Sequence, residues 1–99
     1  MARIYQTSTM GEAGIKVGLV DARGQADLWV HRVSSWGLAR GDERWFITDQ
    51  RHDATAWVYF CSIGMAQVLV CFVDTYGEAG WRVPSHKFKG RFTSWRGFL

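Results

Sequence analysis

The stretch VCFVDTYGEAGWR, residues 70–82, contains one complete unit of the pattern that decides the fold. Val70 and Phe72 continue an apolar period of two that begins at Val68, and this period is typical of a β-strand with one buried face. Asp74 and Gly77 follow, and residues of these types favour a tight loop or a single helical turn. Two residues after the glycine stands an alanine. We therefore interpret the unit as a short strand followed by a corner.

The same unit occurs six times, with successive starts 13, 13, 15, 12 and 13 residues apart. These starts are Ile4, Val17, Val30, Trp45, Trp57 and Val70. The fifth position holds a polar or small residue in every unit: Ser8, Asp21, Ser34, Asp49, Cys61 and Asp74. The tenth position holds alanine without exception: Ala13, Ala26, Ala39, Ala54, Ala66 and Ala79. The register slips around the third and fourth units, where residues 40–43 look like a short insertion.

Each part of the unit has an expected structural role. Alternate strand residues should point inward: Ile15, Val17, Leu19, Leu28, Val30, Trp45, Ile47, Trp57, Tyr59, Val68, Val70 and Phe72. The fifth-position Ser or Asp should cap the corner by accepting an N–H hydrogen bond, as at a helix N-terminus. The glycine three residues later, replaced by His52 in one unit, should supply a positive φ. The repeated alanine should admit close packing of the corner against the sheet.

Length and composition favour one compact domain. Ninety-nine residues support a single core, and 47% hydrophobic residues against 21% charged ones argue against disorder. No apolar run could span a bilayer and no signal peptide is evident, so we expect a cytoplasmic protein without membrane insertion. We also expect a monomer. Cys61 and Cys71 lack zinc-site spacing, and both are expected to be small buried hydrophobic residues.

The candidate catalytic residues have structural explanations. Asp21, Asp49 and Asp74 share one repeat position, so corner capping explains them better than acid–base chemistry does. The histidines have no metal-binding spacing, and the glycines recur once per unit instead of forming a phosphate-binding loop. We therefore predict no catalytic residue, metal or cofactor. The alternative is an enzyme with a composite loop site, which would need His31 or His52 beside an Asp in a pocket.

The C-terminal segment, residues 81–99, has chemistry that the repeat does not require. It carries five cations and no acidic residue: Arg82, Lys87, Lys89, Arg91 and Arg96. Aromatic residues stand between them, a mixture that suits single-stranded nucleic acid or an anionic surface. The favoured interpretation is instead that Trp81, Phe88 and Phe92 anchor the core while the cations face water. The integrin-type tripeptide Arg40-Gly41-Asp42 is treated as a coincidence.

Two strings in the chain carry a family resemblance. VDARGQADL at residues 20–28 and VDTYGEAGWR at residues 73–82 resemble the septoil-knot (Septknot) family, and the resemblance extends over roughly residues 3–92. It departs from the family pattern at His52, at Cys61 and in the tail. The resemblance implies a chain threaded into a seven-crossing knot, with no established activity and no catalytic residues.

From the residues alone, the strands could meander, coil into a solenoid or interleave, since each arrangement buries one strand face. The sequence thus predicts a mainly β domain with short helical corners at residues 1–92, followed by a tail at residues 93–99. We expect a non-enzymatic structural or interaction module. Its partner and biological role are not identified by the sequence, and nucleic-acid or anionic-surface binding through the C-terminal segment is the alternative.

Overall fold

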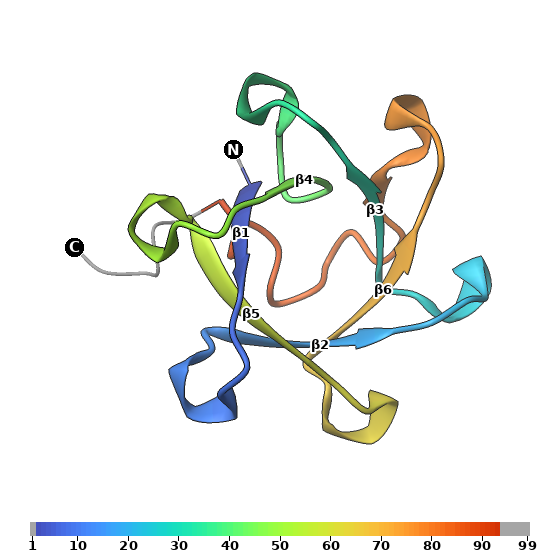
Figure 1. Ribbon diagram of the computed structural model, residues 1–99. Helices are drawn as coiled ribbons and strands as arrows, with labels where there is room; N and C mark the ends of the chain where they lie inside the picture. The colour runs from blue at the N-terminus through green and yellow to red at the C-terminus, as the bar shows by residue number, and fades with distance from the viewer. Residues whose placement is uncertain (1, 94–99) are drawn as a thin grey trace.

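A computed structural model describes residues 2–93 of the chain. These residues form the strands β1 (Ala2–Gln6), β2 (Ile15–Leu19), β3 (Leu28–Arg32), β4 (Arg44–Ile47), β5 (Ala56–Cys61), β6 (Val68–Phe72) and β7 (Gly80–Trp81). A short 3₁₀ helix follows each of the first six: η1 (Met10–Glu12), η2 (Arg23–Gln25), η3 (Trp36–Leu38), η4 (Arg51–Asp53), η5 (Ile63–Met65) and η6 (Tyr76–Glu78). The predicted mainly β fold with short helical corners is confirmed (Figure 1).

The first six strands close into a parallel barrel. Their order is β4-β1-β5-β2-β6-β3, and β3 also pairs with β4 to complete the ring. The short strand β7 adds to β3 in the antiparallel sense. Apart from β3 and β4, neighbours in the barrel lie three or four strands apart along the chain. The strands therefore interleave, which is one of the three arrangements that the sequence left open.

Most corners cross one strand of the barrel. β2 lies between β5 and β6, so the connection through η5 passes over β2 and packs against it. The glycine at position 18 in β2 permits this packing, because a Cβ added there would lie only 2.9 Å from the Cβ of Ala66. A parallel connection usually needs a long crossover. Here a single 3₁₀ turn suffices, since the chain has only one intervening strand to cross.

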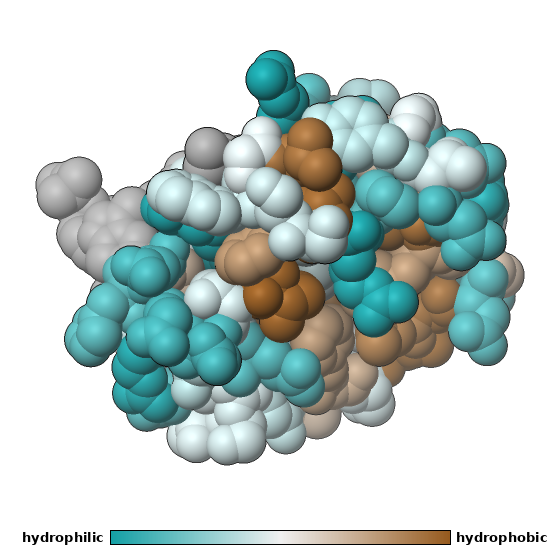
Figure 2. Space-filling model, turned by 45° about the horizontal axis from the view of Figure 1, so that its top comes forward, coloured by the Kyte–Doolittle hydropathy of each residue, from teal (hydrophilic) through white to brown (hydrophobic). Residues whose placement is uncertain are grey.

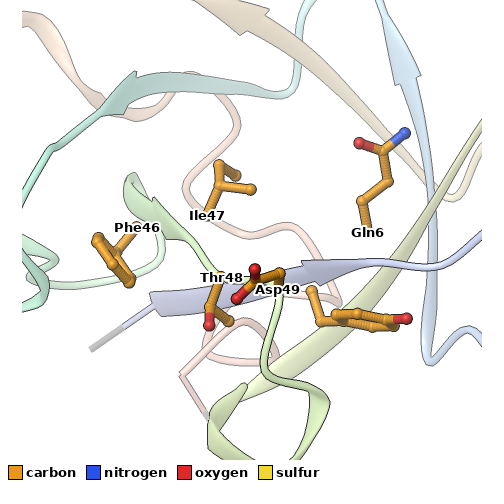
Figure 3. A pocket seen from close by; sticks show the side chains of 6 residues that line it. Gln6, Phe46, Ile47, Thr48 and Asp49 are labelled. Atoms are coloured by element: carbon orange, nitrogen blue, oxygen red, sulfur yellow. The ribbon is translucent and has the colours of Figure 1, made fainter.

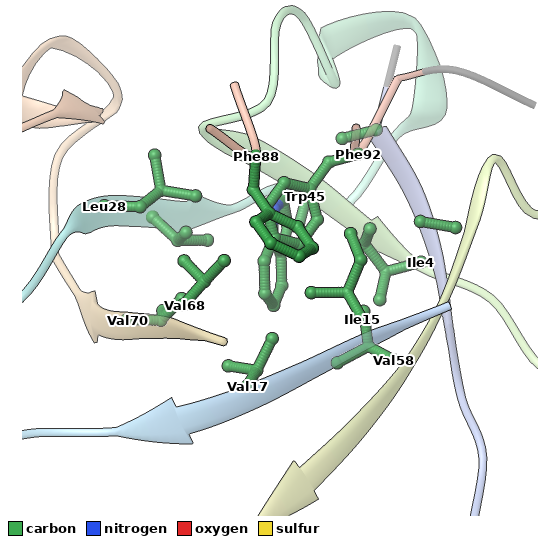
Figure 4. Close-up of a cluster of buried hydrophobic side chains, with 13 residues drawn as sticks. Ile4, Ile15, Val17, Leu28, Trp45, Val58, Val68, Val70, Phe88 and Phe92 are labelled. Carbon is green, nitrogen blue, oxygen red and sulfur yellow. The ribbon is translucent and has the colours of Figure 1, made fainter. Parts of the chain in front are cut away.

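The barrel interior is filled by layers of apolar side chains. One residue from the middle of each strand is fully buried: Ile4, Val17, Val30, Trp45, Val58 and Val70. A second layer lies nearer the amino ends of the strands and consists of Ala2, Ile15, Leu28, Ala56 and Val68. Phe88 and Phe92, from beyond the repeats, pack onto these layers (Figure 4).

The inward face was predicted correctly in the middle of most strands and wrongly at several carboxyl ends. Leu19 is 47% exposed and Ile47 44% exposed, because the filled layers end before these residues. In β5 the predicted residues Trp57 and Tyr59 are only half-buried, whereas Val58 is fully buried. The fifth unit therefore starts at Val58, and its corner is one residue shorter than the others.

The 3₁₀ helices confirm a helical turn at each corner but not the predicted capping. The N-cap residue is the one after the fifth position, such as Ala22 or Gln50, and none of the six makes a side-chain cap hydrogen bond. Within residues 2–93, the corner N–H groups that donate to a hydroxyl use Thr7 or Thr48, one position before the expected cap. The capping role is therefore wrong for Ser8, Asp21, Ser34, Asp49 and Asp74.

The corner glycines do not supply a positive φ. Among the described residues, the glycines with positive φ are Gly41 at 68° and Gly90 at 88°, and both lie outside the six corners. A Cβ added at Gly24 would meet no atom within 4 Å, and the same holds at three other corners. This open space explains why His52 fits at the equivalent position.

The repeated alanines differ in burial. Ala26, Ala39 and Ala54 are fully buried, as close packing requires. Ala26 belongs to a small apolar cluster with Val20 and Cys71 on the outside of the barrel. The remaining alanines are half-buried: Ala13, Ala66 and Ala79. Of the cysteines, Cys71 is buried as predicted, whereas Cys61 is only half-buried.

Candidate functional site

The amino end of the barrel is closed by residues 82–93. Phe92 is fully buried, and its ring lies 5.3 Å from that of Trp45, centroid to centroid. Its carbonyl accepts a hydrogen bond of 2.7 Å from the hydroxyl of Thr55, which directly precedes β5. In Figure 1 this segment, orange to red, crosses the middle of the ring of strands. Phe88 and Phe92 are thus core anchors, as the favoured interpretation expected, and Trp81 is half-buried.

Asp42 ties the insertion at residues 40–43 to this seal. Its side chain is buried, and its Oδ2 accepts hydrogen bonds from the indole N–H of Trp81 and the backbone N–H of Gly90. Its backbone carbonyl accepts the indole N–H of Trp45 at 2.7 Å. Burying a carboxylate is costly without such donors. Because the carboxylate of Asp42 is buried, the integrin-type tripeptide does not display its acidic group at the surface.

His86 secures the segment at the same end. Its Nε2 lies 3.3 Å from Oδ2 of Asp27, and its ring stacks on Trp81 with centroids 5.2 Å apart. Its Nδ1 accepts the backbone N–H of Phe88 at 3.1 Å. The carboxylate of Asp27 also accepts the backbone N–H of Leu69 at 3.0 Å. These contacts hold residues 82–93 against the strands and give His86 and Asp27 a structural role.

The histidines expected in a composite catalytic site lie elsewhere. Nδ1 of His31 lies 3.0 Å from the carbonyl oxygen of Val73, and His52 is exposed in η4. Within residues 2–93 neither forms an ion pair with an Asp. The same residues contain no group of three His, Cys, Asp or Glu side chains placed to hold a metal.

The carboxyl end of the barrel is open. A hollow of about 370 Å³ is lined by one residue from the end of each of the six strands: Gln6, Leu19, Arg32, Ile47, Phe60 and Phe72. We call this set the mouth ring. Its members hold the third position of their units once the fifth unit is counted from Val58. Ligand sites in folds built on parallel strands commonly lie at this end.

A groove of about 510 Å³ opens beside the mouth ring, between the ends of β1 and β4 (Figure 3). Gln6 and Ile47 line both hollows. The groove exists because the ladder between β1 and β4 ends at Ile4 and Ile47, beyond which β1 pairs with β5 alone. The corner that follows β4 contributes Asp49 to the groove.

Arg32 is the charged residue of the mouth ring. Its guanidinium carbon lies 4.3 Å from the centroid of the Phe72 ring, a cation–π geometry. Among the ion pairs of the described residues, none involves Arg32. The N–H groups at the edge of the guanidinium therefore remain available to an anion.

The predicted basic residues of the C-terminal segment lie at the surface. Lys87, Lys89 and Arg91 are exposed, and the guanidinium of Arg91 lies 5.0 Å from the ring centroid of Phe88. Arg82 is also exposed, although its Nε donates to the carbonyl of Ala26. Arg96 and the rest of residues 94–99 lie outside the described part of the chain.

Sequence reasoning missed the mouth ring and Asp42. The sequence pattern assigns Leu19 and Ile47 to the core and gives no role to Gln6 or Arg32. Comparing the third residue of each of the six units, with the fifth unit counted from Val58, would have identified the mouth ring. Asp42 had no comparable signal because it lies outside the repeat. Figure 2 shows apolar residues gathered in patches on one face of the molecule. Exposed apolar residues also occur on the corners, for example Trp36 and Ile63.

The architecture defines a class of protein: a small closed barrel of six parallel, interleaved strand-and-corner repeats. Comparison with protein-family models identifies the family within this class. Residues 1–82 match the 7(1) septoil knot domain, and the chain belongs to this septoil-knot family. Phe88 and Phe92, which pack into the amino end, lie beyond the matched residues. No curated protein and no solved structure matches the chain. In residues 2–93, no helix has the length and apolar character needed to cross a membrane.

Proposed function

We propose that this domain is a non-enzymatic binding module that uses the mouth ring as its binding surface. The observation that carries the proposal is the difference between the two ends of the barrel. Residues 82–93 seal one end, whereas the other keeps a hollow with four large apolar side chains around it: Leu19, Ile47, Phe60 and Phe72. Apolar surface left exposed in a concave site is typical of ligand binding.

The chemistry of the mouth ring favours binding over catalysis. Its polar members are Gln6 and Arg32. An amide does not titrate, and a guanidinium remains protonated throughout the physiological range, so neither provides a general acid or base near neutral pH. At the sealed end, the carboxylates of Asp42 and Asp27 and the imidazole of His86 hold residues 82–93 in place. These features fit a rigid scaffold that presents a preformed concave surface to a ligand.

The threaded topology implied by the family would serve this role. The interleaved strands bring one residue from each of the six units together in the mouth ring. A knotted chain would restrict the motions that widen or collapse the opening. The knot is part of the proposal.

Binding at the mouth ring can be tested by NMR titration with octan-1-ol, a small neutral apolar probe. Saturable shifts should concentrate at Leu19, Ile47, Phe60 and Phe72. The variant Leu19→Ser should weaken binding severalfold, whereas Ile63→Ser, a comparable change at an exposed corner residue, should leave it unchanged. Shifts spread over the whole surface, or equal effects of the two variants, would contradict the proposal.

A second candidate function is binding of anionic polymers by the C-terminal segment. It is favoured by the exposure of four cations within ten residues: Arg82, Lys87, Lys89 and Arg91. Affinity for labelled single-stranded oligonucleotides should then fall steeply as salt rises, through counterion release. Replacing the four cations by Gln should abolish binding. Absence of binding at low salt, or retention of binding by the quadruple variant, would eliminate this candidate.

A further inference from the structure

We infer that the mouth ring selects a small amphiphilic carboxylate, with its apolar part in the hollow and its carboxylate on Arg32. This inference rests on the proposed binding function and adds the chemical class of the ligand. Three features carry it: the depth of the hollow, its size, and the placement of a single guanidinium in an otherwise uncharged ring.

The depth of the hollow limits how far a ligand enters. Directly below the mouth ring lies the layer of fully buried residues that includes Val17, Val30, Val58 and Val70. Because this layer is packed, an apolar chain cannot continue into the barrel interior. It must lie against the rim, where Leu19 and Ile47 are nearly half exposed.

The size of the hollow favours a small molecule. Its volume of about 370 Å³ is at the lower end of the range for small-molecule sites, roughly 300–1,000 Å³. The adjoining groove between β1 and β4 shares Gln6 and Ile47 with the mouth, so an apolar chain has a lateral continuation at this side. A short chain or a single aromatic ring fits these dimensions.

The charge of the ring favours an anionic headgroup. Arg32 stands on β3, stacked on Phe72 of β6, and this stacking orders the guanidinium before a ligand arrives. The planar N–H edge of a guanidinium matches the two oxygens of a carboxylate and forms paired charge-assisted hydrogen bonds. The amide of Gln6 offers a further polar contact on the ring. The acidic residue of the adjoining groove, Asp49, makes a cationic headgroup the competing possibility.

The test compares three probes of equal chain length on the full-length protein: octanoate and octyltrimethylammonium, each below its micelle concentration, and octan-1-ol below its solubility limit. Dissociation constants come from calorimetry and from the NMR shifts of Leu19 and Ile47. Octanoate should bind about tenfold more tightly than octan-1-ol, because only octanoate pairs with the guanidinium. Octyltrimethylammonium should bind more weakly than octan-1-ol.

Variants assign the selectivity to Arg32. In Arg32→Gln, octanoate should bind no more tightly than octan-1-ol binds to the same variant, and Arg32→Lys should restore part of the preference for octanoate. Arg40→Gln, which removes another exposed arginine, should have no effect. Equal affinity for octanoate and octan-1-ol, unaltered selectivity in Arg32→Gln, or preference for the cationic probe would overturn the inference while leaving the binding function intact. If none of the three probes binds the parent protein saturably, the proposed binding function itself is overturned.

Discussion

Substituting Phe92 by Ala tests whether the C-terminal segment is part of the core. Phe92 is fully buried and packs against Trp45 and Trp81, with centroid distances of 5.3 Å and 6.3 Å. Truncating a buried Phe to Ala removes about 3–5 kcal/mol of stability, a large part of the roughly 5–15 kcal/mol that stabilises an ordinary domain. For a domain of this size, the melting temperature should fall by about 12 °C or more.

Urea unfolding monitored by tryptophan fluorescence measures this loss, with equilibrium approached from both the folded and the unfolded state. The matched control is Ile63→Ala, which truncates an apolar side chain that is 55% exposed in η5. The control should change the free energy of unfolding by no more than about 0.5 kcal/mol. If Phe92→Ala cost as little as the control, residues 82–93 would not seal the barrel, and the assignment of Phe92 to the core would be refuted.

Three further predictions concern the corners and the topology. Ala26→Leu should cost about 1–3 kcal/mol, because Ala26 is fully buried, whereas Ala79→Leu should cost less at its half-buried position; equal melting temperatures for the two variants would contradict this ranking. The hydrogen bond from Arg23 lowers the pKa of Glu78 below its ordinary value. The contribution of this ion pair to stability should therefore be present at neutral pH and be lost as the pH falls through the lowered pKa. An NMR titration in which Arg23→Gln fails to raise the Glu78 pKa would reject this cause. Refolding should be much slower than in helical domains, because the interleaved strands pair over long sequence separations, and stopped-flow refolding complete within milliseconds would argue against a threaded chain.

The strands and corners were predictable because the alternating apolar positions of the repeat indicate which face of each strand is buried. Val17, Val30 and Val70 sit at one position of the unit, and each fills the barrel interior. The order of the strands was not predictable from the same pattern. Alternation is equally satisfied by neighbours adjacent in sequence and by neighbours three or four strands apart.

Alternation also cannot show where a core ends along a strand. Leu19 continues the pattern of Val17, and Ile47 continues that of Trp45, yet both lie beyond the last filled layer. The assignment of Trp57 to the inward face was wrong for a related reason. A large apolar side chain can pack on the outside of a barrel, and the indole N–H of Trp57 donates to the carbonyl of Arg51 in the preceding corner. Asp42 lies outside the repeat, so its buried contacts with Trp81 and Gly90 required the tertiary structure.

The seal at one end of the barrel and the opening at the other are tested most directly by solvent paramagnetic relaxation of methyl-labelled protein. A soluble paramagnetic probe should broaden the methyl signals of Leu19 and Ile47 at the mouth ring strongly. The methyls of Ile15 and Leu28, which lie nearer the sealed end, should remain protected. Equal protection of all four residues would mean that the mouth is closed, and broadening of Ile15 and Leu28 would mean that residues 82–93 do not cover the amino end.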